Sequence, residues 1–427
     1  MPAPDLHQQF KELVKTTPVV DVHNDLPYQL RWQLHYEINE DKFKFDEPLV
    51  SQTDLIRLRK GGVGLQFFSC WMDYPSADEL YKDFETPNSI VRDTLEQVDI
   101  VKRLVDKYSK CMKFVTSADE ALKSYIESDN KLISVTMGVE GLHQVDTSLA
   151  VVRQYFDLGV RYITLTHNCD NPFATACTTI IAGKEDKGLT LYGHECVKEF
   201  NRIGMMVDLS HVSHKTMVDV LKITKAPVIF SHSSAYTMTP HERNVRDDVL
   251  LMVKENGGVI CINFVPNFIK KEGATGATID DCVDHIVHIV NLIGWDHIAI
   301  GSDFDGMGAT GPEGLEDVSK YPDLVVKVWE KTKASADDIK KFMGINMLRV
   351  WKECELVAEA LKNELPVEAT WSGRKWRFPR YITLCPELFP GAATSTSTPD
   401  MFYDAKRFNF KDDEVEYDPK RPGFEAK

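Results

Sequence analysis

The sequence predicts a (β/α)8 barrel of the TIM type with a C-terminal helix and an extended irregular tail. Eight short runs rich in Val, Ile and Phe are nearly continuous in apolar residues, as are parallel strands buried on both faces. Intervals with helical periodicity separate these runs. The count of eight favours a closed barrel. A doubly wound open sheet has the same alternation and is the alternative fold.

The eight expected strands all have the length of strands in parallel sheets. They are VVDVHND (19–25), VGLQFFSCW (63–71), LISVTMGVEG (132–141), YITLTHN (162–168), MMVDLSH (205–211), PVIFSHS (227–233), GGVICINFV (257–265) and HIAIGSDFD (297–305).

The intervals between the runs predict helices because apolar residues recur at three- and four-residue steps. This pattern covers 89–109, 194–204, 214–224 and 279–294. After residue 335 the chain reads as one long amphipathic helix, with Ser335 as its N-cap.

The chain divides into a barrel and an extension. Residues 1–362 are expected to form the barrel domain, and 363–427 a C-terminal extension. From about Glu364 the pattern dissolves into Pro, aromatic and acidic residues, and ATSTSTPD (393–400) is the most linker-like piece. We expect the extension to wrap the barrel or to mediate an oligomer contact in a homodimer.

Composition narrows the possible partners. Hydrophobic residues make up 43% and charged residues 27% of the chain, which is ordinary for a globular enzyme. The net charge of −15 argues against nucleic acid or an anionic membrane as a partner, since both require basic patches. The nine cysteines are scattered without a CxxC pair, which favours free thiols in a reducing compartment.

Targeting signals are not visible in the sequence. The first residues lack a basic segment followed by an apolar one, and no apolar run approaches the roughly 18 residues of a membrane span. The polar end DPKRPGFEAK does not resemble a lipid-anchor signal. We therefore expect a soluble cytoplasmic protein.

Six of the eight runs end in His, Asp or Glu. The ends are His23-Asn24-Asp25, Glu140-Gly141, Thr166-His167-Asn168, Ser210-His211, Ser231-His232-Ser233 and Ser302-Asp303-Phe304-Asp305. In a (β/α)8 barrel the carboxyl ends of the strands meet at one mouth, where catalysis takes place. One histidine at a strand end means little, but six such ends predict a shared site.

This set of imidazoles and carboxylates suits zinc, with manganese or cobalt as exchangeable ions. His23 and Asp25 point to the same face because a strand has a period of two, so they can bind one ion together. The number of candidate ligands exceeds the three protein ligands of a single zinc, which favours two Zn²⁺ ions per chain with Glu140 as the bridging ligand. The remaining positive charge would stabilise a bridging hydroxide.

The motifs DVHNDLP, GVEGLH, LTHNCDNP, DLSHVS, VIFSHSSA, RNV and GSDFDG, in this order, resemble the membrane (renal-type) dipeptidases, a branch of the amidohydrolase-like barrels. The stretch PEGLEDVSKYPDL (312–324) is also similar, and the resemblance covers roughly residues 10–360.

The resemblance implies a role for each matching residue. His23 and Asp25 would hold the first zinc, His211 and His232 the second, and Glu140 would bridge. Asp303 would contact the bridging water and carry its proton to the departing amine. His167 would contact the scissile carbonyl or the oxyanion, and Arg243 would bind the substrate carboxylate. Animal members of the family are secreted and lipid-anchored, so only the catalytic part of the resemblance transfers.

The implied activity is zinc-dependent hydrolysis of small dipeptides, including cysteinylglycine. One alternative is a carboxypeptidase-like removal of glycine from Cys-Gly adducts derived from glutathione. Another is a different amidohydrolase reaction, such as that of a lactonase, deaminase or phosphotriesterase. Those relatives typically carry HxH on the first strand and often a modified lysine on the fourth, where this chain has HxD and His167. A catalytically silent scaffold protein is the third hypothesis.

Other polar residues near these motifs are expected to have structural roles. His214, His285 and His288 would lie on helices, and His143 would lie outside the ligand set. Asp303 is preferred over Asp305 because it ends the strand. Asp21 and Asp208 could orient histidines. His194-Glu195 is not part of an HExxH motif.

Overall fold

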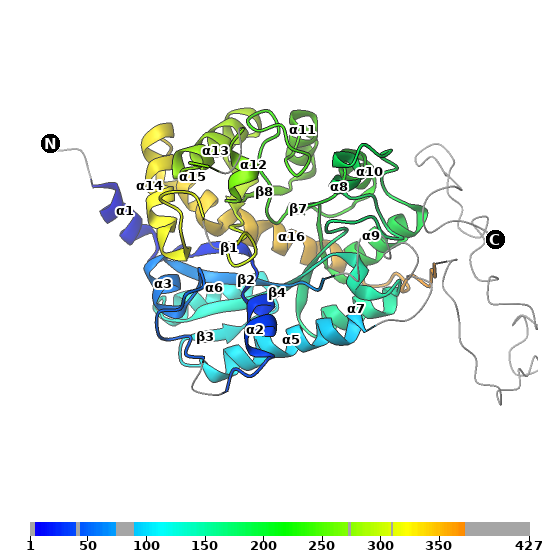
Figure 1. The fold of residues 1–427 in the computed structure, drawn as a ribbon, viewed down its shortest axis with the longest axis horizontal. Coiled ribbons are helices and arrows are strands. Elements are labelled where there is room, and N and C mark those ends of the chain that lie inside the picture. Colours follow the sequence, from blue (N-terminus) through cyan, green and yellow to red (C-terminus); the bar gives the residue numbers. More distant parts are fainter. Residues whose placement is uncertain (1–4, 40–42, 74–88, 272–274, 309–310, 372–427) are drawn as a thin grey trace, which may run out of the picture.

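The computed structural model of the 427-residue chain describes residues 5–39, 43–73, 89–271, 275–308 and 311–371. Figure 1 shows helices surrounding a central sheet, and all pairings between its strands are parallel.

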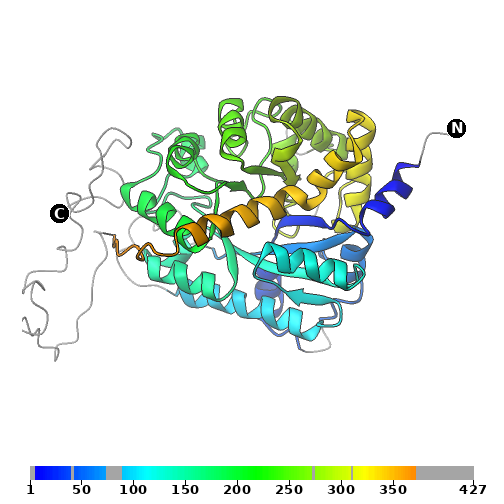
Figure 2. The ribbon, with the colours of Figure 1, turned by 180° about the vertical axis from the view of Figure 1, so that it is seen from behind.

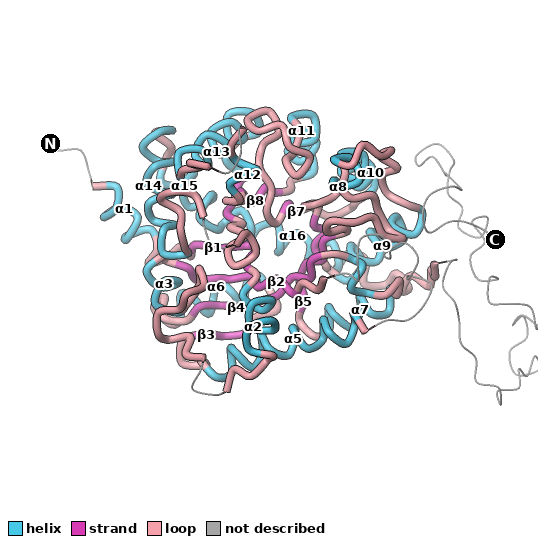
Figure 3. Tube along the Cα trace, viewed as in Figure 1, coloured by secondary structure: helices cyan, strands magenta, loops and turns pink. Residues whose placement is uncertain are grey.

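Eight strands close into a ring, which confirms the predicted barrel (Figure 3). They are β1 (Val19–Asn24), β2 (Val63–Cys70), β4 (Ile133–Glu140), β5 (Val160–Thr164), β6 (Met206–Asp208), β7 (Ile229–Phe230), β8 (Val259–Ile262) and β9 (Ile298–Ile300). Pairing of β2 with β4 and of β1 with β9 closes the ring. Seven of these strands fall within their predicted runs, and β5 begins at Val160, two residues before the predicted start at Tyr162.

A ninth strand, β3 (Met112–Phe114), was not predicted. It pairs with the first residues of β4 at the amino-terminal edge of the sheet, so that Met112 lies opposite Ile133. Three residues with a lysine in the middle carry no apolar periodicity, which is why the sequence pattern missed this strand.

The strands are apolar throughout because both of their faces are buried. Val20, Phe67 and Tyr162 belong to a cluster that fills the inside of the barrel. Val19 and Phe68 belong to a second cluster that packs against the surrounding helices. This two-sided burial produces the nearly continuous apolar runs.

Helices lie in all four intervals predicted from periodicity, 89–109, 194–204, 214–224 and 279–294, and others lie before, between and after them. Their bounds are α1 (Leu6–Leu13), α2 (Leu26–Leu34), α3 (Leu55–Lys60), α5 (Ile90–Lys107), α6 (Ala118–Glu127), α7 (Leu149–Asp157), α8 (Cys177–Ile181), α9 (Leu191–Ile203), α10 (His214–Ile223), α11 (Asp247–Asn256), α12 (Pro266–Ile269), α13 (Ile279–Ile293), α14 (Tyr321–Thr332), α15 (Ala336–Lys340) and α16 (Asn346–Ala360).

The long helix predicted after residue 335 is interrupted, so the prediction of one continuous helix was wrong. Ser335 caps α15 as predicted, accepting a hydrogen bond from the backbone N–H of Asp338. A wider helical turn, Lys341–Ile345, then separates α15 from α16, and Gly344 departs from helical geometry there. At this point the helix backbone comes very close to β1. A Cβ on Gly344 would lie 2.5 Å from Cγ2 of Val20 and 2.7 Å from the carbonyl oxygen of Pro18.

α16 lies across the back of the barrel in Figure 2. Its Trp351 is fully buried and packs edge-on against Phe67 from inside the barrel, with 5.4 Å between the ring centroids. α16 therefore closes the end of the barrel that lies away from the carboxyl ends of the strands.

The described start of the extension packs on α9. The buried carboxylate of Glu199 accepts hydrogen bonds from Arg153 (2.8 Å) and from the backbone N–H of Val367 (3.1 Å). Ala369 and Trp371 are buried. The remainder of the predicted extension, 372–427, lies outside the described residues. Among the helices of the described ranges, none combines the length and apolar character that a membrane crossing needs.

We predict that Gly344→Ala lowers the free energy of unfolding by about 3 kcal/mol, because the new methyl group collides with Pro18 and Val20. Gly183→Ala is the control. Gly183 has a φ of +71°, but its added Cβ meets nothing within 4 Å, so only about 1 kcal/mol of backbone strain is expected. Urea unfolding of both variants measures the difference, and equal costs would contradict the close approach.

Candidate active site

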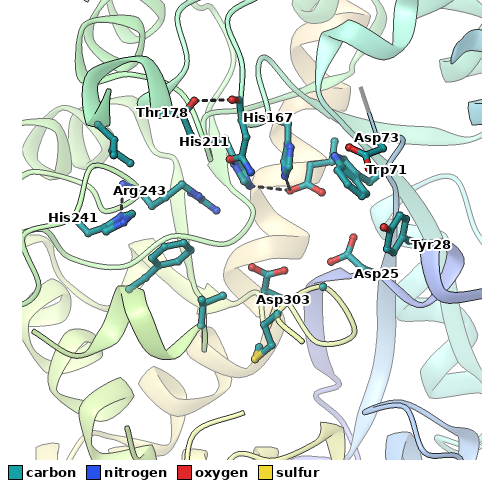
Figure 4. A pocket seen from close by; sticks show the side chains of 17 residues that line it. Asp25, Tyr28, Trp71, Asp73, His167, Thr178, His211, His241, Arg243 and Asp303 are labelled. Carbon is teal, nitrogen blue, oxygen red and sulfur yellow. Dashed lines mark hydrogen bonds and ion pairs between the residues drawn. The ribbon is translucent and has the colours of Figure 1, made fainter. Parts of the chain in front are cut away.

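The carboxyl ends of the strands surround a cavity of about 650 Å³. Its lining includes six of the predicted site residues, several of which are labelled in Figure 4: Asp25, Glu140, His167, His211, Arg243 and Asp303. The other two, His23 and His232, are fully buried and lie against Glu140. The structure therefore brings all eight predicted residues together.

Glu140 is the centre of this cluster. Its Oε1 atom lies 2.9 Å from Nε2 of His211, 3.2 Å from Nε2 of His232 and 3.6 Å from Nε2 of His23. Asp25 contacts the same ring nitrogen of His23, with 3.4 Å between Oδ2 and Nε2. The end of β4 therefore places one carboxylate oxygen within reach of three imidazoles.

Each of these imidazoles has a hydrogen-bond partner at Nδ1. His23 contacts the phenol oxygen of Tyr162 at 2.9 Å, and His211 contacts Oδ1 of Asn168 at 3.1 Å. The amide oxygen of Asn168 can only accept, so the proton of His211 lies on Nδ1.

His232 is held by a chain of two hydrogen bonds. Its Nδ1 lies 2.8 Å from Oγ of Ser231, which donates to Oδ2 of Asp208 at 2.6 Å. The Ser231 hydroxyl therefore accepts the Nδ1 proton of His232. All three rings turn an Nε2 lone pair toward Glu140.

This convergence of lone pairs fits a metal site. Nε2 of His211 and Nε2 of His232 lie only 2.9 Å apart, and Nε2 of His23 is buried without a hydrogen bond. Such atoms repel one another unless a cation lies among them. Three groups have the spacing of metal ligands: His23 with Asp25 and Glu140, Glu140 with His211 and His232, and His23 with His232 and Asp303.

Burial and the neighbouring carboxylates shift the pKa values of the three imidazoles. Burial opposes the imidazolium of His23, but the carboxylates of Asp25 and Glu140 outweigh it and raise the pKa of His23 well above its ordinary value. Burial lowers the pKa of His211 and of His232 well below the ordinary range.

Asp303 lies on the cavity wall, close to Asp25 (Figure 4). Burial and the charge of Asp25 raise the pKa of Asp303 well above its ordinary value. Its φ of +65° is rare for a residue with a side chain. The structure separates it from Asp305, whose carboxylate accepts the backbone N–H of Gln52 at 2.7 Å. Gly306 follows closely, and a Cβ there would lie 2.2 Å from Oδ2 of Asp25.

His167 lies beside Glu140, with 3.9 Å between Nε2 and Oε1. Burial lowers the pKa of His167 to about 4, so its ring is neutral at pH 7. Trp71 packs against this ring at a centroid distance of 5.0 Å. A neutral imidazole at this position can donate a hydrogen bond into the cavity.

Arg243 forms a cationic end of the cavity. Only 3% of its surface is exposed, and its guanidinium carbon lies 5.2 Å from the centroid of the Phe268 ring. One Nη atom donates to the carbonyl oxygen of His232 at 3.3 Å, whereas Nε and the other Nη have no hydrogen-bond partner among the described residues. A buried guanidinium with free donors is suited to binding a carboxylate.

Several candidates lie away from this centre. His143 is buried and contacts the carbonyl oxygen of Met72 at 2.9 Å. His214 and His288 pair with Asp248 and Asp247 at the surface.

Asp21 does not contact a histidine ring. Its carboxylate accepts hydrogen bonds from the backbone N–H (3.0 Å) and the hydroxyl (2.9 Å) of Ser302. These bonds lie next to the position where β1 pairs with β9, with Asp21 opposite Ile300. Asp208, by contrast, holds His232 through Ser231.

Sequence reasoning missed the residues that support the ligands and line the cavity. Tyr162 and Ser231 lie on runs that were identified as strands, but neither was assigned a contact. Tyr28 and Trp71 form an aromatic wall, with 4.7 Å between their ring centroids. The available signal was Trp71 at the end of the second run, since six of the other runs end in His, Asp or Glu.

A parallel barrel with buried imidazoles and carboxylates at the carboxyl ends of its strands belongs to the class of metal-dependent hydrolases. Comparisons with known proteins narrow this class. The sequence profile of the membrane dipeptidase family, peptidase family M19, matches residues 7–365. Two proteins of Schizosaccharomyces pombe, both named uncharacterized dipeptidases, are similar over most of their length. One is 58% identical over 386 residues, covering 90% of this chain and 92% of the relative. The other is 44% identical over 356 residues, covering 82% and 84%.

Solved structures agree with this result. The crystal structure of dipeptidase AC, a metallopeptidase of the same family, is 26% identical with a TM-score of 0.68, covering 79% of this chain and 99% of that one. A metallopeptidase from Rhodobacter sphaeroides is 25% identical with the same TM-score and the same coverage. The chain therefore belongs to the membrane dipeptidase family and is a metallo-dipeptidase. Metallopeptidases of this family are zinc-dependent.

His285 provides a test of histidine burial outside the cavity. Its Nδ1 accepts the backbone N–H of Ala235 at 3.0 Å, and burial lowers the pKa of His285 to about 4. The unfolded chain binds a proton there below about pH 6.5, whereas the folded chain does not until about pH 4, so stability falls as the pH falls through this window.

We predict that His285→Asn reduces the loss of unfolding free energy between pH 7 and pH 5 by about 2 kcal/mol. Urea unfolding of the metal-free protein at both pH values measures this slope. An unchanged slope in the His285 variant would contradict the assignment.

Proposed function

We propose that the protein is a binuclear zinc dipeptidase that hydrolyses the peptide bond of small dipeptides, cysteinylglycine among them. His23, Asp25 and Glu140 would hold one ion, and Glu140, His211 and His232 the other, with Glu140 bridging. The observation that carries this proposal is the convergence of three Nε2 lone pairs on one oxygen of Glu140, at 2.9 to 3.6 Å. Mn²⁺ or Co²⁺ would be exchangeable for zinc, since the ligands are imidazoles and carboxylates.

Zinc bound at this centre supplies Lewis acidity, which lowers the pKa of water and polarises a carbonyl group. The residues of the chain provide the remaining chemistry. Asp303 takes the proton from the attacking water and delivers it to the departing amine, a role that suits a carboxyl group whose pKa is raised. His167 donates a hydrogen bond to the oxygen of the scissile carbonyl as negative charge develops there.

Arg243 binds the carboxylate of the second residue. Its free Nε and Nη donors match the two oxygens of a carboxylate, and its burial excludes competing water. The Rhodobacter sphaeroides relative was crystallised with a phosphinate mimic of the dipeptide L-Ala-D-Ala, which supports a dipeptide as the substrate here as well.

The size of the cavity favours a second candidate, removal of glycine from S-substituted Cys-Gly adducts. At about 650 Å³ the cavity lies in the range of pockets that bury drug-sized ligands, so its volume is sufficient for a dipeptide with a bulky first residue. Comparing kcat/KM for Cys-Gly, other dipeptides including one with a D-residue in second position, and S-substituted Cys-Gly distinguishes the two. A clear preference for the adducts would favour the second candidate.

We also propose that residues 1–362 form the catalytic barrel and that 363–427 pack on it or contribute to a homodimer. The contact between Glu199 and Val367 supports such packing. The eight cysteines of the described residues form no disulfide with one another, which supports a location in the cytoplasm. Light scattering tests the homodimer, which a monomer would contradict, and fractionation of the native host tests the location, which a secreted enzyme would contradict.

We predict about two zinc ions per wild-type chain and a loss of dipeptide hydrolysis in Glu140→Gln. Loss of the bridging carboxylate should lower activity by more than the tenfold to hundredfold that is typical when a hydrogen-bond partner of a metal ligand is removed. Metal analysis and kcat/KM for a dipeptide are the measurements. Glu195→Gln, which changes a buried carboxylate paired with Lys198 outside the cavity, is the control. Full activity of folded Glu140→Gln would refute the proposed centre.

We predict that Arg243→Lys raises KM for dipeptides about tenfold, because the ammonium group keeps the charge but loses the two-pronged geometry. Hydrolysis of the corresponding dipeptide amides should differ little between variant and wild type, since they lack the carboxylate. Arg246→Lys, at a residue paired with Glu242, is the control. An equal effect on dipeptides and amides would show that Arg243 does not bind the carboxylate.

A further inference from the structure

Tyr162 lies on β5 inside the barrel, and its side chain is fully buried. Its phenol oxygen is 2.9 Å from Nδ1 of His23 and donates to the carbonyl oxygen of Val22 at 3.1 Å. A phenol has one proton, and a carbonyl oxygen can only accept, so the proton points to Val22. The phenol oxygen then has only a lone pair to offer His23, and it must accept the proton on Nδ1.

We infer that Tyr162 is a positioning residue that keeps a proton on Nδ1 of His23 and thereby reserves Nε2 as a metal ligand for the position shared with Asp25 and Glu140. The inference rests on the proposed binuclear centre, because the choice of ring nitrogen matters only if that position binds an ion. A partner at the far nitrogen fixes the tautomer and the orientation of a ligating imidazole, and losing such a partner typically costs about tenfold to hundredfold in metal affinity.

The packing around Tyr162 holds its phenol in place. Gly138 lies directly opposite Tyr162 in the register of β4 and β5, and a Cβ there would lie 2.0 Å from the ring. Phe67 packs on the ring with 5.9 Å between the centroids. The missing side chain of Gly138 therefore provides the space through which the ring reaches His23 on β1.

The other two imidazoles use different partners. His211 depends on Asn168, and His232 depends on Ser231 and through it on Asp208. No hydrogen bond described for these two rings involves Tyr162. Loss of the Tyr162 hydroxyl should therefore affect one metal position and spare the position formed by Glu140, His211 and His232.

Tyr162→Phe tests the inference, because it removes the hydroxyl and keeps the ring. Zinc titration of the metal-free protein in competition with a chelating dye gives the affinity of each position. We expect one of two binding events to weaken about tenfold to hundredfold and the other to remain unchanged. Nitrogen-15 NMR of the histidine rings in the metal-free protein, recorded at a pH high enough for His23 to be neutral, gives a second readout, and the hydrogen-bonded Nδ1 proton of His23 should be lost.

Tyr192→Phe is the matched control, since Tyr192 is equally buried and its hydroxyl donates to the carbonyl oxygen of Thr147 at 2.7 Å. It should bind zinc as wild type does. If Tyr162→Phe keeps both affinities and the Nδ1 signal, or weakens both positions equally, the inference is wrong while the proposed function stands. If the wild-type chain binds fewer than two ions, the proposed centre fails, and the NMR signal alone still decides whether Tyr162 holds the tautomer of His23.

Discussion

Electrostatic repulsion among lone pairs is the constraint on which the site depends. One oxygen of Glu140 and the Nε2 atoms of three imidazoles lie within a few ångströms of one another, where water cannot screen them. Only protons or cations make such a cluster stable. A metal ion held among these atoms would meet this need. The hydrogen bonds at the outer nitrogens hold each lone pair in place when the rings would otherwise turn away.

The fold meets this constraint with rigid parts. A closed barrel brings the ends of strands that are distant in sequence to one mouth, and α16 closes the opposite end. His211 and Asp303 each lie three residues after the end of a strand and have positive φ angles of 65°, a conformation that turns the chain sharply while the side chain stays at the mouth. Gly306 leaves room for the carboxylate of Asp25. Such strained or closely packed backbone persists because the surrounding barrel determines it.

The amino-acid pattern was sufficient for the barrel and for the residues at its mouth, because two-sided burial leaves continuous apolar runs and strand ends are readable. It was insufficient for Tyr162, whose role depends on register across the barrel and on a missing side chain at Gly138. β3 was too short to show a period. The break at Gly344 follows from the proximity of β1, which no local pattern encodes. Contacts between distant strands are thus the part of the site that local sequence cannot supply.

The ring closes between β1 and β9, where Asp21 accepts hydrogen bonds from Ser302. During synthesis β1 leaves the ribosome long before β9. The edge of β1 that pairs with β9 therefore stays unpaired while most of the barrel is made. All five proposed metal ligands precede the closing strand, whereas Asp303 arrives with it. A nascent chain can thus gather its metal-binding side chains before it gains the group proposed to move protons, and hydrolytic competence would appear only when the barrel shuts.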